Sequence, residues 1–66
     1  MDTDRIQATI LAHRRLKRVY RFPERAPEWP EIMADLADAE AFYRGLDELT
    51  PDQALDYRRV LAALKR

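Results

Sequence analysis

His13 is the side chain in this sequence best suited to acid–base chemistry or metal binding. An imidazole titrates near neutral pH, so a lone histidine can act as a general base or a metal ligand. Arg14 and Arg15 follow it directly and would repel a cation, and no Asp or Glu lies three or four residues away. We therefore expect His13 to be a polar residue at the edge of the core.

The carboxylates Glu31, Asp35 and Asp38 form a second group that could do chemistry. Carboxylate clusters bind divalent cations and supply acid–base pairs. These three lie on one predicted helix, with no loop to complete a coordination sphere, and so favour a solvated acidic face. The chain also has no Ser, no Cys and one Gly, which removes two common nucleophiles and any glycine-rich phosphate loop. We expect no catalytic residue, no metal and no cofactor, and hence no enzyme.

Charge is unevenly distributed along a chain whose net charge is zero. Residues 1–22 carry six basic and two acidic side chains, residues 23–56 carry two and ten, and residues 57–66 carry four basic ones. Five basic side chains form what we call the basic strip: Arg14, Arg15, Lys17, Arg18 and Arg21. This strip can complement the acidic middle of the chain within the fold, or it can bind an external anion.

Nucleic acid and protein are the two classes of partner that these charges could bind. Nucleic-acid-binding domains are usually strongly basic, which a chain of zero net charge is not. A helix-turn-helix is also disfavoured, because its recognition helix would open with Asp52 and Asp56, which repel phosphate. The strip could instead bind an acidic protein. A basic protein could bind the aromatic and acidic face formed by Trp29, Tyr43, Glu31, Asp35 and Asp38.

The spacing of apolar residues predicts three helices and no strand. The helices cover about 3–21, 30–45 and 51–65, with a proline-rich connector over 22–29. We expect one domain, 1–66, with an all-α fold: a small antiparallel three-helix bundle in which a long first helix packs against a hairpin of the other two.

The predicted helix ends rest on local signals. Asp2 or Thr3 can cap the first helix, and Thr50 can cap the third in a capping box with Gln53. Gly45 is expected to end the second helix in the left-handed conformation.

The predicted core is formed by one face of each helix. In the first helix this face is Ile6, Thr9, Ile10, Ala12, His13, Leu16, Val19 and Tyr20. In the second it is Trp29, Ile32, Leu36, Ala39, Tyr43 and Leu46, and in the third Ala54, Tyr57, Val60, Leu61 and Leu64. Leu11 stands out as an apolar residue among the charges of the first helix. The connector is expected to be stiff and extended, with Phe22 and Trp29 folding back over helix ends.

These observations favour binding over catalysis. A chain of 66 residues has a marginal core, so we expect self-association or an obligate protein partner. We expect a cytoplasmic protein, with no membrane association and no small-molecule substrate. The preferred function is a non-enzymatic helical protein–protein interaction module of bacterial or phage type: a small regulator, inhibitor or assembly factor. The alternative is a nucleic-acid-binding accessory protein that uses the basic face of the first helix.

Overall fold

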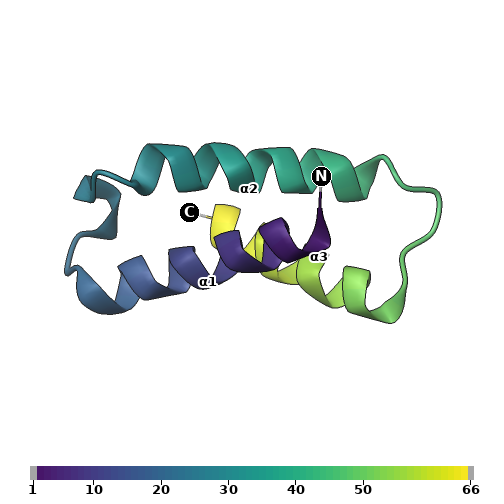
Figure 1. The fold of residues 1–66 in the computed structure, drawn as a ribbon, viewed down its shortest axis with the longest axis horizontal. Helices are drawn as coiled ribbons and strands as arrows, with labels where there is room; N and C mark the ends of the chain where they lie inside the picture. The colour runs from purple at the N-terminus through teal and green to yellow at the C-terminus, as the bar shows by residue number, and fades with distance from the viewer. Residues whose placement is uncertain (1, 66) are drawn as a thin grey trace.

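The helices in the computed structural model, which describes residues 2–65, are α1 (Thr3–Val19), α2 (Trp29–Arg44) and α3 (Pro51–Leu64). Successive helices run antiparallel, and a turn of 3-10 helix, η1 (Pro23–Arg25), lies between α1 and α2 (Figure 1). Each helix contacts the other two, and no strand is present among the described residues. The predicted all-α three-helix architecture is confirmed.

Side-chain caps fix the starts of α1 and α3. The Oδ1 atom of Asp2 accepts a hydrogen bond from the backbone N–H of Asp4 at 3.1 Å. At the start of α3, the Thr50 hydroxyl accepts from the Gln53 backbone N–H at 3.1 Å, and the Gln53 side chain accepts from the Thr50 N–H at 3.0 Å. This reciprocal pair is the predicted capping box, and it satisfies two backbone donors that would otherwise have no partner.

Removing the Thr50 cap should destabilise the fold measurably. Thr50→Ala leaves the Gln53 backbone N–H without its acceptor, and we expect the free energy of unfolding to fall by about 1 kcal/mol. Chemical denaturation followed by circular dichroism would measure the change. Thr50→Ser keeps the hydroxyl and should retain most of the stability. Equal losses in the two variants would show that the cap does not hold the start of α3.

The connector between α1 and α2 differs from the prediction. α1 ends at Val19, earlier than the expected end near residue 21, because Pro23 excludes Phe22 from the helical conformation. The chain then turns through η1 instead of running extended, so that prediction is wrong. Phe22 is 47% exposed and lies against the guanidinium groups of Arg21 and Arg25, whose carbons are 5.5 and 5.0 Å from the ring centre. It does not cover a helix end.

The apolar face of α2 is buried as predicted, with Ile32, Leu36, Ala39 and Tyr43 at its centre. This face lies in the middle of the core, where Leu36 and Ala39 are fully buried. Gly45 does follow the last residue of α2, but its backbone is right-handed, with φ −79° and ψ −9°. The predicted left-handed conformation at Gly45 is wrong.

The buried face of α3 contains the predicted Val60, with Tyr57 and Leu64 packed against the core, and differs from the prediction at two positions. Asp56 and Val60 are its buried residues, with exposed fractions of 2% and 0%, whereas Leu61 is 42% exposed. Asp56 and Val60 lie one helical turn apart, so they share one side of α3. The core therefore includes a carboxylate that the apolar pattern does not indicate.

The last turn of α1 has no helix to cover it on one side. In Figure 1 this end of α1 extends past the end of α3. Val19 and Tyr20, which were expected in the core, are 66% and 40% exposed. Within residues 2–65, no helix has both the length and the apolar character that a membrane crossing requires.

Candidate protein-interaction surface

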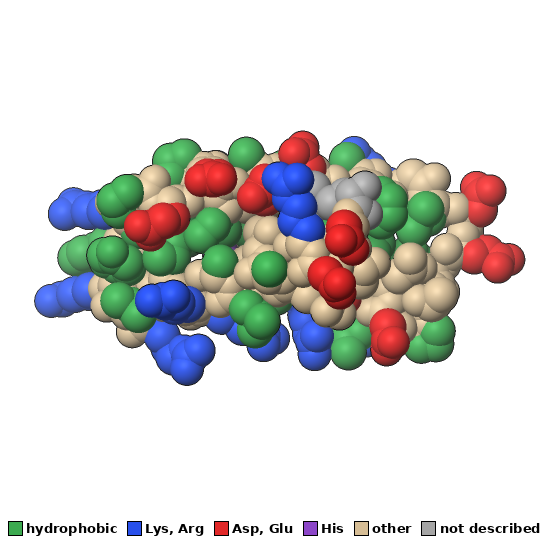
Figure 2. Space-filling view, viewed as in Figure 1, with side chains coloured by type: hydrophobic (Ala, Val, Ile, Leu, Met, Phe, Trp, Pro, Cys, Tyr) green, Lys and Arg blue, Asp and Glu red, His purple; other side chains and the backbone are tan. Residues whose placement is uncertain are grey.

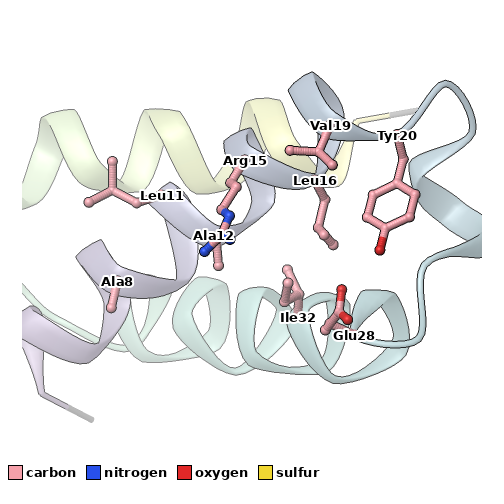
Figure 3. A pocket seen from close by; sticks show the side chains of 9 residues that line it. All are labelled: Ala8, Leu11, Ala12, Arg15, Leu16, Val19, Tyr20, Glu28 and Ile32. Atoms are coloured by element: carbon pink, nitrogen blue, oxygen red, sulfur yellow. The ribbon is translucent and has the colours of Figure 1, made fainter.

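An open groove of about 590 Å³ lies between α1 and α2 (Figure 3). We call it the α1–α2 groove. It is lined by Ala8, Leu11, Ala12, Arg15, Leu16, Val19, Tyr20, Glu28 and Ile32. All of these residues belong to α1, to α2 or to the chain that joins them.

The groove is apolar over most of its surface. Leu16 and Ile32 are buried in its floor, and Ala8 and Ala12 line the adjoining stretch with small side chains. Leu11 and Val19, at 61% and 66%, are the most exposed large apolar side chains described, and both line the groove. Tyr20, 40% exposed, lines it near the connector. Burying this surface against another chain would be favourable.

Two charged side chains of opposite sign also line the groove. Arg15 comes from α1 and Glu28 directly precedes α2. Neither takes part in an ion pair among residues 2–65. Arg5 and Asp35, by contrast, join α1 to α2 through an ion pair of 3.5 Å.

The basic strip is exposed along its whole length but does not form a single face. Arg15 lines the α1–α2 groove, whereas Arg14 and Lys17 line a separate hollow of about 200 Å³ between α1 and α3, together with Arg59. Arg18 is exposed, as is Arg21, which lies against the Phe22 ring. Figure 2 shows Lys and Arg side chains along α1, and Asp and Glu side chains over α2 and the α2–α3 connection.

The acidic residues of α2 remain at or near the surface. Glu31 and Asp38 are exposed, and Asp35 is half-buried beside Arg5. In the described range 2–65, no three His, Cys, Asp or Glu side chains are close enough together to hold a metal ion.

The two aromatic residues proposed for partner binding lie in different environments. Tyr43 is 1% exposed and packs in the core against Phe42 and Tyr57, with ring centres 5.4 and 5.7 Å away. It is therefore not available as a surface anchor. Trp29 is half-buried, with its ring centre 5.4 Å from that of His13.

Tyr43 belongs to a buried polar cluster that sequence analysis missed. Asp56 accepts hydrogen bonds from Gln7 Nε2 at 3.2 Å and from Arg59 at 3.3 Å, and so links α3 to α1. The Tyr43 hydroxyl is buried without a hydrogen-bond partner among the described residues. Its burial and the charge of Asp56 raise the pKa of Tyr43. A buried carboxylate in a marginal core indicates that α3 is oriented by this cluster as well as by apolar contacts.

His13 is only 6% exposed, so it is buried more deeply than we expected for a residue at the edge of the core. Burial, and then the nearby charge of Lys17, lower the pKa of His13 below its ordinary 6.5. Lys65, Arg59 and Glu24 line the two hollows that border it. The imidazole is therefore neutral near pH 7.

The lowered pKa of His13 predicts a loss of stability in weak acid. The unfolded chain takes up a proton at His13 more readily than the folded chain, so unfolding is favoured as the pH falls through 6.5. We expect the melting temperature to fall between about pH 7.5 and 5.5, the range in which an ordinary histidine titrates. His13→Leu, which cannot titrate, should show a smaller fall. The same pH dependence in both proteins would contradict the prediction.

No family model, curated protein sequence or solved structure gives a significant match to this chain. Function is therefore inferred from the α1–α2 groove, its exposed apolar side chains and the two charges that line it.

Proposed function

We propose that this chain is a non-enzymatic, cytoplasmic protein–protein interaction module, a small regulator, inhibitor or assembly factor, that receives a helix in its α1–α2 groove. The observation that carries the proposal is the gathering of Leu11, Val19 and Tyr20 along one groove. They are three of the six large apolar side chains that are exposed among the described residues, 2–65. Apolar side chains exposed singly are common on protein surfaces, whereas contiguous ones mark interaction sites.

The shape of the groove supports a helix as the bound element. Two antiparallel helices form its walls, and a third helix packs into such a groove by placing its side chains between theirs. Ala8 and Ala12 have small side chains, so a bound helix can approach α1 closely. Recognition would follow the helix-in-groove mode, in which apolar residues three and four positions apart anchor the bound helix.

The test compares proteins captured from extracts of the native host by tagged variants. The groove variant Leu11→Asp/Val19→Asp places two charges on the apolar rim. Both positions are exposed, so the fold should be kept, as circular dichroism would verify. Leu55→Asp is the matched control, because Leu55 is 45% exposed on α3 and does not line the groove. We expect a protein that binds the wild type and the control and is lost in the groove variant.

Two results would contradict this proposal. A protein captured equally by the wild type and by both variants would place the binding surface elsewhere on the chain. Capture of nucleic acid alone would favour the alternative function.

Nucleic-acid binding is a second candidate function, favoured by one specific observation. Arg14, Lys17 and Arg59 line the same hollow between α1 and α3, so cations from two helices converge there. Arginine forks match phosphate geometry, and such binding weakens steeply as salt rises. The test is a mobility shift with duplex and single-stranded DNA at low salt. A shift lost in Arg14→Glu/Lys17→Glu/Arg59→Glu would support this candidate, and no shift would exclude it for these probes.

A further inference from the structure

We propose that the occupant of the α1–α2 groove is a helix of about three turns in another protein, with an apolar stripe that is bordered by acidic side chains along one edge and by basic side chains along the other. This inference rests on the proposed function and names the chemistry of its partner. The bound helix would add a fourth helix to the three of this chain.

The groove lies on the side of the α1–α2 pair that α3 leaves open. Arg14 and Lys17 of α1 line the hollow beside α3, whereas Ala12 and Arg15 line the groove. With 3.6 residues per turn, these two pairs lie on nearly opposite sides of α1. A helix placed in the groove would therefore contact α1 and α2 without displacing α3, and the four helices would pack as a bundle.

The groove is limited in length at both ends. Its wall on α1 runs from Ala8 to Val19. At 1.5 Å per residue this stretch is about 17 Å long, which corresponds to about three helical turns. One turn before Ala8, the ion pair between Arg5 and Asp35 joins α1 to α2 at 3.5 Å and limits the groove there. At the other end, the chain leaves α1 at Tyr20 and crosses to α2 (Figure 3).

The two rims of the groove carry opposite charges. Arg15 lines the groove on α1, and Arg18 follows it by one turn on the same side of the helix. Glu28 lines the groove at the start of α2, and Glu31 follows it at the same spacing. Arg15 and Glu28 have no ion-pair partner among residues 2–65, so both can pair with charges on a bound helix.

A helix lying over the floor of the groove would face both charges at once. Figure 3 shows Arg15 and Glu28 on either side of Leu16 and Ile32, so they face different edges of a helix placed over these two residues. An acidic side chain on the edge nearest α1 would pair with Arg15, and a basic one on the edge nearest α2 would pair with Glu28. A helix with the same charge on both edges would meet one of them with like charge, which costs free energy. The charges therefore select a helix with one edge of each sign.

The test uses three synthetic helical peptides of about 14 residues, slightly longer than the groove. All have leucines at spacings of three and four and differ only in the side chains that border this stripe. The mixed peptide has Glu along one edge and Lys along the other, the acidic peptide has Glu along both, and the basic peptide has Lys along both. Reversing a helix exchanges its edges, so the mixed peptide matches the groove in one of its two directions. Fluorescence anisotropy of the labelled peptides measures binding.

We expect the wild type to bind the mixed peptide at least about threefold more tightly than the other two at low salt. Arg15→Glu replaces the basic charge that lines the groove with an acidic one, so this variant should prefer the basic peptide. Glu28→Arg makes the opposite change and should prefer the acidic peptide. Leu11→Asp/Val19→Asp removes apolar contact surface and should weaken binding of all three peptides by about tenfold or more.

Arg14→Glu and Glu48→Arg are the matched controls. They change the net charge by the same amounts as the two groove variants, at exposed positions that do not line the groove. The general attraction between protein and peptide therefore changes equally, and both controls should still prefer the mixed peptide. Thermal unfolding by circular dichroism would verify that each variant is folded.

The outcomes separate this inference from the proposed function. Equal binding of the three peptides, or a preference that the controls switch as the groove variants do, overturns the assignment of charges to the partner. No peptide binding up to roughly 500 µM also overturns it, since peptides that fit a groove bind in the micromolar range. A host protein lost in Leu11→Asp/Val19→Asp would still support the proposed function in both cases. A wild type that dimerises through Leu11 and Val19 in sedimentation equilibrium would make a second copy the occupant and overturn this inference.

Discussion

Tyr43→Ala is expected to remove a large share of the stability of this protein. Tyr43 is 1% exposed and its ring packs between α2 and α3, where it contacts Tyr57. Truncating a buried aromatic ring to alanine costs about 3–5 kcal/mol, from lost burial and from the cavity left behind. A chain of this length has a total stability of roughly 3–10 kcal/mol at about 0.05–0.15 kcal/mol per residue. The loss therefore removes a large share of it, as urea denaturation followed by circular dichroism would measure.

Tyr43→Phe separates the ring from its hydroxyl. The hydroxyl is buried without a hydrogen-bond partner among residues 2–65, so it has lost its contacts with water without gaining a replacement. We expect the phenylalanine variant to be as stable as the wild type or up to about 1 kcal/mol more stable. A loss of more than about 1 kcal/mol would show that the hydroxyl forms a hydrogen bond, for example through a water molecule to Asp56.

Leu36→Ala is the second change with a large expected effect. Leu36 is fully buried near the middle of α2, the helix that packs against both others. Its truncation should lower the free energy of unfolding by about 2–5 kcal/mol, the range found for buried leucines. The midpoint of denaturation should shift strongly towards lower denaturant concentration, with the slope of the transition unchanged.

Leu11→Ala is the matched control for this prediction. It makes the same chemical change on α1, but Leu11 is 61% exposed, so stability should change by no more than about 0.5 kcal/mol. Both variants should be measured at low protein concentration, so that self-association does not contribute. Comparable losses for Leu11 and Leu36 would mean that Leu11 is buried against another chain even under those conditions.

The parts of the fold that depend on residues close together in the sequence were predictable from the sequence. Thr50 and Gln53 form the expected capping box because both members lie within one turn of the chain. The central face of α2 was also predictable, since a helix covered on two sides shows a clear apolar periodicity.

Features that depend on how the helices meet were not predictable in this way. Apolar periodicity assigned Val19 to the core, but it cannot show that α1 extends beyond α3 and leaves this residue exposed. It also placed Leu61 inside and gave no sign that Asp56 is buried, because the partners of Asp56 include Gln7, a residue far away in the sequence. Gly45 ends α2 without a left-handed turn, which residue type alone does not decide.

The candidate surface was visible in the sequence only in part. Leu11 was the one clear signal, as an apolar residue among the charges of its helix. The contribution of Glu28 required the structure, because it depends on the connector bringing the start of α2 beside the end of α1. The basic strip was identified as a set of residues, but its division between two faces of α1 follows from where α3 packs.

The short connections between helices have a consequence for how quickly this protein folds. Nine residues separate Val19 from Trp29 and six separate Arg44 from Pro51, so each helix meets the next after a brief search by the chain. Closing short loops costs little entropy, and helical proteins dominated by local contacts fold within microseconds to milliseconds. A newly made chain would therefore form its α1–α2 groove well before any binding partner reaches it by diffusion at low cellular concentration. A partner would then meet a groove that is already formed, and the rate of binding would be set by diffusion and by the partner's concentration, with no contribution from folding.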